Sequence, residues 1–302
     1  MVRRGSAFFS SRTARRFVLA LSAAVVVAGC GAFHRETDPR ARDRAHQVLD
    51  RWADAVAAAG IASPVTPVGE LTAQIGDWEP AVGDNNKRSL MAGLLAAGDG
   101  LADERPPDGQ VTWRDGRSAR VPLLSPKEAI AAIVARPEPC ADCTGLFATE
   151  ARLTSGPIET TRGPATGPIW EFTLVGTAVK VTRVALANAV TVDPLFDGDP
   201  QIGLAIDSAQ GTASGKEVTV AFVGAPDPGD QPCGEDYTAE AAESDLAVVV
   251  IVTRQPHGPQ LGGGCSAVGA RRTATATLAA PLGERVVLDL QQGIPVPIER
   301  SP

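Results

Sequence analysis

The pattern of hydrophobic and polar positions predicts a long first helix in this chain. The helix begins at Thr37 or Asp38, has Pro39 in its first turn, and ends at Gly60. Its apolar face recurs at helical spacing and consists of Ala45, Val48, Leu49, Trp52, Val56 and Ala59. The opposite face is polar, so we expect one side of the helix to be buried.

Two further helices and a hairpin are expected in the first half of the chain. A second helix is predicted at 85–97, where apolar residues again fall on one face. A third is predicted at 126–135, because Ser125 and Glu128 have the spacing of a capping box. Between these helices, residues 111–123 form a hairpin pattern around an Asp-Gly turn.

Alternating apolar runs predict strands, most of them in the second half of the chain. The expected strands are 71–78, 146–153, 158–161, 169–175, 178–186, 202–206, 216–223, 246–253, 267–278 and 285–290. The segment 188–200 is rich in Asp, Pro and Gly and predicts a boundary. The fold class expected is therefore α+β, with an α+β module at 38–188 followed by a smaller β-rich, sandwich-like module at 189–302, stapled by disulfides.

The amino terminus has the pattern of an export signal. Five arginines precede an apolar run at 17–28, which is too short to span a bilayer. The run ends in Val27, Ala28, Gly29 and Cys30, which have the form of a lipobox. We expect cleavage of residues 1–29 and lipidation of Cys30. The alternative is an ordinary secretory signal with a chance cysteine.

Lipidation would place the protein at the cell membrane, on its extracytoplasmic face. The protein would bind the membrane through the lipid anchor. Residues 30–37 would form a tether of at most about 27 Å between the anchor and the folded part. Two or more acyl chains anchor a protein stably, whereas one does so only marginally. Arg15-Arg16 leaves open whether the general or the twin-arginine export route is used.

Charge and composition narrow the set of partners. Removal of residues 1–29 would change the net charge from −7 to −12, because that segment holds five arginines and no acid. Such an acidic chain is not expected to bind nucleic acid. Aromatic residues make up only 4% of the sequence, so stacking platforms for sugars or bases are difficult to build.

Four cysteines remain after the lipidated one, and an exported chain with an even number of cysteines is expected to form disulfides. Three pairings are open; we favour Cys140 with Cys143 and Cys233 with Cys265, because each pair then lies within one module. Cys140 and Cys143 have the spacing of a redox or metal-binding pair. The preceding residues 137–139 are Pro-Glu-Pro rather than a strand leading to a helix, which favours a structural bond.

Two acidic stretches, 193–199 and 235–245, are candidates for calcium binding. Neither has the spacing of a known calcium loop, so we expect solvated acidic loops and no metal site. Glu243 or Asp245 is expected instead to pair with Arg271 or Arg272 on a neighbouring strand.

Catalytic motifs are missing from the sequence. It contains no Gly-x-Ser-x-Gly, His-Glu-x-x-His or P-loop motif, and nothing places a serine and an acid beside His34, His46 or His257. We therefore expect no catalytic residues, no cofactor and no enzymatic activity, although carboxylate-only catalysis needs no sequence spacing and stays open.

Several separated motifs in the second half of the chain form a recognisable pattern. They are Cys233, Glu243-Ser244, 247–252, Cys265, Arg271-Arg272-Thr273, 281–285 and Leu288-Asp289. This pattern resembles the carboxy-terminal region of uncharacterised actinobacterial lipoproteins. The first half, with Cys140, Cys143, 162–165 and 170–172, is similar to their companion region. The resemblance covers most of the mature chain and implies no activity.

The function expected from these observations is that of a membrane-anchored, non-enzymatic interaction protein of the cell envelope, with an envelope protein as its partner. The alternative is a lipoprotein that binds a small ligand or solute in a cleft between the two modules. Such a cleft is expected to be lined by Trp78, Trp113 or Trp170, and the sequence leaves the small-molecule ligand unknown.

Overall fold

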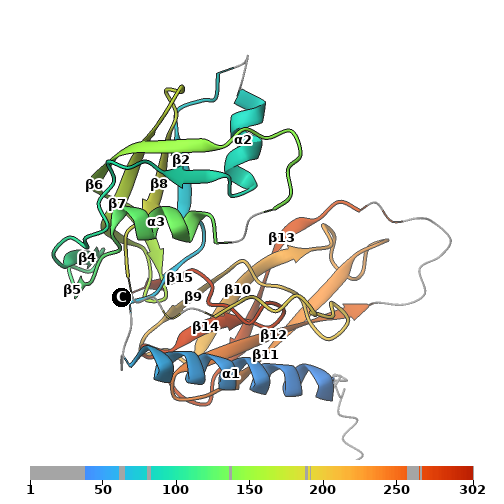
Figure 1. Cartoon of the computed structure of the whole chain (residues 1–302). Helices are drawn as coiled ribbons and strands as arrows, with labels where there is room; N and C mark the ends of the chain where they lie inside the picture. The colour runs from blue at the N-terminus through green and yellow to red at the C-terminus, as the bar shows by residue number, and fades with distance from the viewer. Residues whose placement is uncertain are drawn as a thin grey trace, which may run out of the picture. The chain divides into compact units, whose positions relative to one another are not determined.

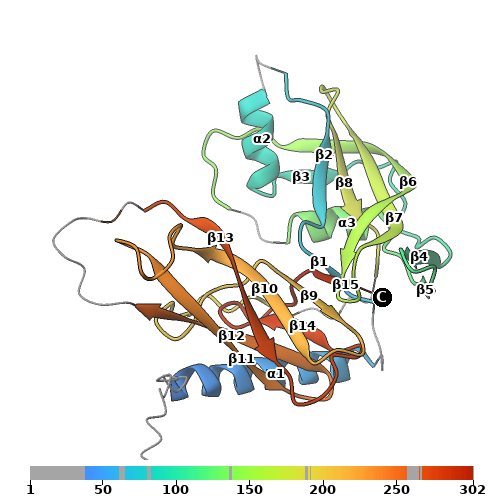
Figure 2. The same ribbon diagram turned by 180° about the vertical axis from the view of Figure 1, so that it is seen from behind.

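The computed structural model describes residues 38–60, 65–79, 83–135, 138–187, 190, 192–256, 265 and 267–301. Among the described residues the fold is mostly β, with 41% of them in strands, 15% in helices, and several sheets (Figures 1 and 2). The prediction of an α+β fold is therefore wrong. The predictions for the signal peptide, for Val27, Ala28, Gly29 and Cys30, for the tether, and for His34 and His257 lie outside the described residues.

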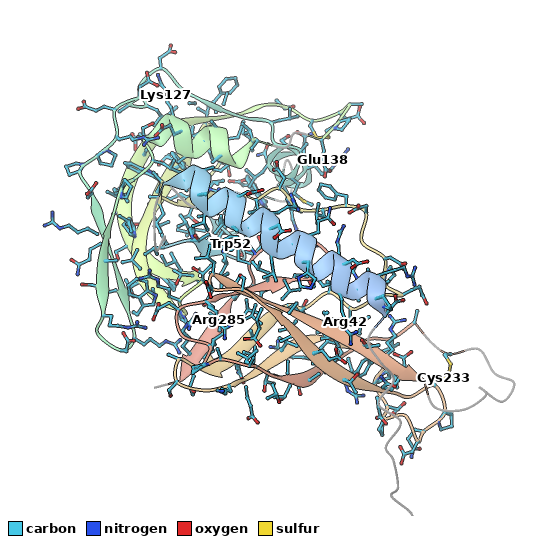
Figure 3. The ribbon with its side chains drawn as sticks, turned by 90° about the horizontal axis from the view of Figure 1, so that it is seen from below. Arg42, Trp52, Lys127, Glu138, Cys233 and Arg285 are labelled. Carbon is cyan, nitrogen blue, oxygen red and sulfur yellow. A yellow bond between two sulfur atoms is a disulfide. The ribbon has the colours of Figure 1, made fainter. Side chains whose placement is uncertain are left out.

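Helix α1 (Pro39–Ala59) forms where the sequence predicted it. The Asp38 carboxylate accepts a hydrogen bond from the Arg40 backbone N–H, and Gly60 ends the helix with φ of +66°. Trp52 is 1% exposed at the centre of the buried face. The helix contacts β11 (Glu235–Glu243) and β12 (Ala247–Pro256), so its apolar face covers strands from the far end of the chain (Figure 3).

The two other helices in the described residues are shorter than expected. Helix α2 (Gly83–Met91) ends before Gly93, which adopts a φ of +70°. The end of the predicted second helix instead forms β3 (Leu95–Ala97), which pairs in parallel with β6 (Leu146–Thr160). Helix α3 (Pro126–Ile133) has the predicted capping box, with both reciprocal hydrogen bonds between Ser125 and Glu128 present.

The first half of the chain forms an eight-stranded sheet. Its strands are β1 (Pro67–Val68), β2 (Thr72–Ile75), β3, β4 (Gly109–Trp113), β5 (Ser118–Val121), β6 (Leu146–Thr160), β7 (Ala165–Leu174) and β8 (Lys180–Val184). The main path runs β1-β6-β7-β4-β5, while β3 joins β6, β8 joins β7, and β2 joins β8. The predicted hairpin is confirmed as β4 and β5, whereas two predicted strands at 146–161 are the single strand β6.

The second half of the chain forms two sheets. One has the order β13-β10-β9-β15, and the other has the order β11-β12-β14. The remaining bounds are β9 (Ser208–Thr212), β10 (Glu217–Gly224), β13 (Ala270–Thr277), β14 (Val286–Asp289) and β15 (Ile298–Ser301). The run predicted as a strand at 202–206 contributes only an isolated bridge between Leu204 and Val252.

Residues 247–252 of strand β12 form a continuous apolar run, and both faces of the strand are buried there. Val248, Val250 and Val252 point into a core shared by the two sheets. The alternate residues, Val249 and Ile251 among them, belong to a second core with the apolar face of α1. Together with α1, the second half of the chain thus forms three layers, sheet, sheet and helix, and β12 lies in the middle layer.

A third core fills the first half of the chain, between the eight-stranded sheet and α3. Residues 37–302 nevertheless group by their contacts into one unit. Asn188 and Ala189, which flank the expected module boundary, lie outside the described residues, and the boundary stays a prediction. None of the described helices is long and apolar enough to cross a membrane.

Candidate functional site

The four predicted disulfide cysteines lie in two pairs at disulfide distance, Cys140 with Cys143 and Cys233 with Cys265. Their Cα atoms are 5.5 Å and 5.6 Å apart, respectively, which supports the predicted bonds. The second bond spans 32 positions and stabilises the fold by roughly 4 kcal/mol through lost chain entropy. The first spans 3 positions and contributes only roughly 2 kcal/mol by the same estimate.

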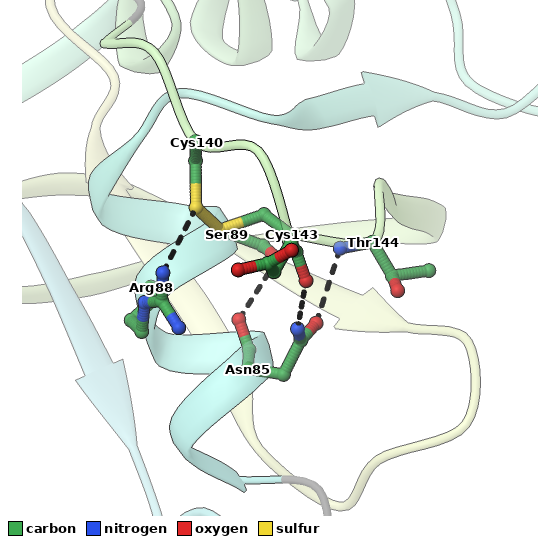
Figure 4. The surroundings of a disulfide bond; sticks show 7 residues. Asn85, Arg88, Ser89, Cys140, Cys143 and Thr144 are labelled. Carbon is green, nitrogen blue, oxygen red and sulfur yellow. Dashed lines mark hydrogen bonds between the residues drawn. A yellow bond between two sulfur atoms is a disulfide. The ribbon is translucent and has the colours of Figure 1, made fainter.

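Polar contacts from α2 surround the short disulfide (Figure 4). The Asn85 side-chain amide donates to the Asp142 carbonyl at 2.5 Å, and its oxygen accepts from the Thr144 N–H at 3.1 Å. One guanidinium nitrogen of Arg88 lies 3.7 Å from Cys140 Sγ. Asn85 therefore holds the loop to the helix through contacts that do not involve sulfur.

The acidic stretch at 235–245 lies mostly on strand β11 rather than in a solvated loop. Glu243 is bound by Arg285, at 2.6 Å, and by the Ala279 N–H, at 2.7 Å. Burial by itself would raise the pKa of Glu243. The hydrogen bonds from the Ala279 N–H and from Arg285 lower it by more, so the pKa lies below its usual value.

The predicted pairing of Glu243 or Asp245 with Arg271 or Arg272 is therefore wrong. Arg271 donates to the Ser208 hydroxyl at 3.2 Å. Arg272 donates to two backbone carbonyls and lies 5.3 Å from the ring centre of Tyr237. Within the described residues, no group of three or more His, Cys, Asp or Glu side chains is placed to hold a metal ion.

A hollow of about 70 Å³ lies where three turns and strand ends meet, and we call it the arginine hollow. Its lining residues are Trp113, Arg114, Asp115 and Arg117 of the β4–β5 hairpin, Arg162, Gly163 and Pro164 of the β6–β7 turn, and Glu299 and Arg300 of β15. The lining thus comes from both halves of the chain and holds four arginines against two carboxylates.

Trp113 lies close to charged groups from two of the turns that line the arginine hollow. The guanidinium groups of Arg117 and Arg162 lie 6.0 Å and 5.7 Å from its ring centre. Its indole N–H donates to the buried Thr160 hydroxyl at 3.1 Å, and that hydroxyl donates to the Gly163 carbonyl at 2.7 Å. The φ of +113° at Gly163 is one that a side chain would strain, so the turn depends on glycine.

Carboxylates hold three of the four arginines. Arg117 contacts Asp115 at 2.7 Å and Glu284 at 3.1 Å, and both contacts raise its pKa. Glu284 also lies 3.5 Å from Arg162. Arg114 is 4.0 Å from Glu299, and its side chain is 78% exposed, so its charge faces solvent.

Arg300 differs from the other three arginines because backbone carbonyls surround its charge. It donates to the carbonyls of Thr161, Gly283 and Arg285, and burial lowers its pKa. Its Nε has no hydrogen-bond partner in the described part of the chain. Arg300 therefore adds a positive charge whose hydrogen bonds go to neutral carbonyl groups, with the Glu284 carboxylate as a nearby counter-charge.

The arginine hollow has side chains suited to bind an anionic group. It is about half the size of a ~150 Å³ cavity that holds one benzene molecule, so a carboxylate or a phosphate fits it. Guanidinium groups bind both through paired, charge-assisted hydrogen bonds. Its lining holds no serine, cysteine or histidine, and Asp115 is engaged by Arg117.

The sequence indicates Trp113 as a possible cleft residue but gives no signal for the arginines around it. Trp78 and Trp170 do not line the hollow: Trp78 donates to Gln74 at 2.8 Å, and Trp170 donates to the Leu124 carbonyl at 2.9 Å. Arg162 and Gly163 were noticed only as part of a family resemblance. Their proximity to β15, more than 130 residues away, has no local signal.

Two larger hollows among the described residues are open to solvent. One, of about 390 Å³, lies along β9 and β10 near Lys216. The other, of about 640 Å³, lies beside the Cys233–Cys265 bond. Neither gathers charged groups as the arginine hollow does.

Comparisons with protein-family models, with curated proteins and with solved structures found no match to this chain.

Proposed function

We propose that this protein is a lipid-anchored interaction protein on the extracytoplasmic face of the cell membrane, and that its arginine hollow binds a partner without catalysing a reaction. The anchor is the lipid on Cys30, as the lipobox at 27–30 indicates. The arginine hollow receives a carboxylate or phosphate group of an envelope partner. The observation that carries this proposal is the convergence of four arginines on one small hollow in an acidic chain.

The size of the hollow supports recognition of one group on a larger partner. Pockets that enclose a whole small molecule usually measure about 300–1,000 Å³. The arginine hollow, at about 70 Å³, is several times smaller. A partner that inserts one acidic group there would rest on the surface around it, where Arg114 is exposed.

The alternative proposal is a solute-binding lipoprotein with a cleft between the modules. The observation in its favour is that the arginine hollow is lined from both halves of the chain and includes Trp113. It requires a ligand no larger than a small anion. Inorganic phosphate and acetate are therefore the probes for this alternative, and a rise in the melting temperature of the purified protein is its expected signal.

Crosslinking in intact cells tests the interaction proposal. Arg114→Gln with Arg117→Gln removes two positive charges from the hollow, and Arg271→Gln, on the exposed face of β13, removes one elsewhere. We expect the wild type and Arg271→Gln to form the same adducts and the double variant to lose them, with all three present at equal levels. Adducts unchanged in the double variant, or no adduct where known envelope complexes are captured, would contradict the proposal.

A further inference from the structure

The short disulfide lies at the surface, where another molecule can reach its sulfurs. Cys140 and Cys143 are each partly exposed, and the two residues between them, Ala141 and Asp142, are exposed. The two cysteines are only 3 positions apart, so the bond constrains a short loop and leaves the rest of the chain unconstrained. The long Cys233–Cys265 bond in the same molecule provides an internal comparison.

A positive charge lies beside one of the two sulfurs. The Arg88 guanidinium is 3.7 Å from Cys140 Sγ, and Figure 4 shows it on the Cys140 side of the bond. Arginine near a cysteine stabilises the thiolate over the thiol. The sequence offers no helix N-terminus at Cys140 for this purpose, and the last turn of α2 supplies a side chain instead.

The loop has contacts that would outlast the bond between its sulfurs. Asn85 binds the Asp142 carbonyl and the Thr144 N–H, and the Glu138 N–H donates to the Ala92 carbonyl at 3.0 Å. These hydrogen bonds hold both ends of the Cys140–Cys143 loop against α2 and the turn that follows it. After reduction, the two thiols therefore stay near each other and near Arg88.

From these observations we infer that Cys140–Cys143 is an exchangeable disulfide that oxidises dithiols, with Arg88 stabilising Cys140 as the leaving thiolate; that the partners are exported polypeptides rests on the location given under the proposed function. A partner thiolate attacks Cys143 Sγ, the Sγ–Sγ bond breaks, and its electron pair goes to Cys140. The second partner thiol loses its proton to water and attacks the partner sulfur of the mixed disulfide. Cys143 then leaves and takes a proton from water.

The exchange moves two electrons and balances without another reagent. The partner dithiol becomes a disulfide, and the protein ends with a Cys140 thiolate and a Cys143 thiol, with one proton released to water. A leaving group that is stable as a thiolate departs faster, which is why the charge on Arg88 matters. The charged neighbours on the loop itself are Glu138 and Asp142, which oppose Arg88.

Equilibration of the full chain with glutathione redox buffers at fixed pH tests this inference. Alkylation and mass spectrometry measure the reduced fraction of each cysteine pair separately. We expect Cys140–Cys143 to be reduced under milder conditions than Cys233–Cys265, while the fold persists. Arg88→Gln is expected to favour the disulfide by about tenfold, which is about 30 mV for a two-electron couple, while Arg88→Lys stays near the wild type.

A second measurement follows transfer to a partner. A reduced peptide with two cysteines is mixed with the oxidised full chain, and we expect one peptide disulfide to form for each Cys140–Cys143 bond lost. A Cys140→Ser, Cys143→Ser variant is expected to oxidise none. Reduction of both disulfides over one range, an equilibrium unchanged in Arg88→Gln, or equal peptide oxidation by the double-serine variant would each overturn the inference.

Discussion

Arg285 holds the turn before β14 through one carboxylate and three carbonyl groups. It binds Glu243 at 2.6 Å and donates to the carbonyls of Ala280, Pro281 and Leu282. Both charged side chains are mostly buried, Arg285 being 11% and Glu243 18% exposed. Removal of one partner would leave the other charge buried without compensation.

We expect Arg285→Ala to lower the free energy of unfolding by about 3 kcal/mol, because Glu243 loses its partner. Arg271→Ala is the matched control, since Arg271 is exposed and, in the part of the chain that the structure describes, its side chain makes one hydrogen bond, to Ser208; its effect should stay within about 0.5 kcal/mol. Denaturant unfolding of the purified proteins measures both. Equal losses in the two variants would show that Arg285 has no special role.

The capping box of α3 predicts a dependence of stability on pH. Hydrogen bonds from Arg105, then from the Ser125 N–H, lower the pKa of Glu128 from 4.5 to about 2. A carboxyl whose pKa is lower in the folded state stabilises the fold above the unfolded pKa. That contribution is therefore present above about pH 4.5 and is lost as the pH falls toward 2.

Glu128→Gln tests this window. We expect it to unfold at lower denaturant than the wild type at pH 6, with the difference shrinking as the pH approaches 2. Glu128 is 39% exposed, so the difference is small. Arg105→Gln should reproduce most of the loss at pH 6, because Arg105 is the largest cause of the shift. A constant difference between pH 6 and pH 2 would assign the effect to packing instead.

Single residues were predictable where their partners are close in sequence. The caps of α1 and α3 follow from spacing alone, and the pairing of Cys140 with Cys143 is favoured among three because each pair then lies within one module. The pairing of Glu243 with Arg285 does not follow from spacing, because that pairing depends on which strands are neighbours in the sheet. Arg285 lies before β14, and β14 reaches β12 through a parallel pairing that has no sequence signal.

At the scale of elements, α1 is held mainly by its apolar face. Trp52 is 1% exposed in the core that α1 shares with β12. We expect Trp52→Ala to lower the free energy of unfolding by about 3–5 kcal/mol. His46→Ala, on the exposed face of the same helix, should change it by less than about 0.5 kcal/mol. Thermal or denaturant unfolding of the two purified variants measures both changes. Similar losses of unfolding free energy in Trp52→Ala and His46→Ala would contradict the burial of Trp52 in this core.

Elements defined by local periodicity were predicted well, and those defined by pairing were not. Helix α1 and the β4–β5 hairpin lie where the pattern placed them. Residues 95–97 follow a helical pattern yet form β3, because pairing with β6 outweighs local propensity. Strand β11 carries a run of acids that reads as a loop, although its backbone pairs with β12 over its full length.

At the scale of the whole molecule, strands outnumber helices among the described residues, which makes the fold mostly β. The arginine hollow forms through contacts between segments that are far apart in the sequence. Arg162 and Arg300 meet there although 138 positions separate them in the sequence. The hollow is lined by four arginines although the whole chain is acidic. This local positive charge is the basis for an interaction with an anionic group. Sequence spacing alone cannot reveal such a site, since its residues come from three separate turns and strands.

The central claim is that the protein acts while anchored to the membrane by a lipid on Cys30. Metabolic labelling with a radioactive fatty acid, followed by separation of the membrane and soluble fractions, tests it most directly. We predict that the wild type carries label and is found with the membrane, whereas Cys30→Ala carries none and is either released or retained with its signal uncleaved. An unlabelled wild type, or a Cys30→Ala variant that is processed and fractionates as the wild type does, would contradict the claim.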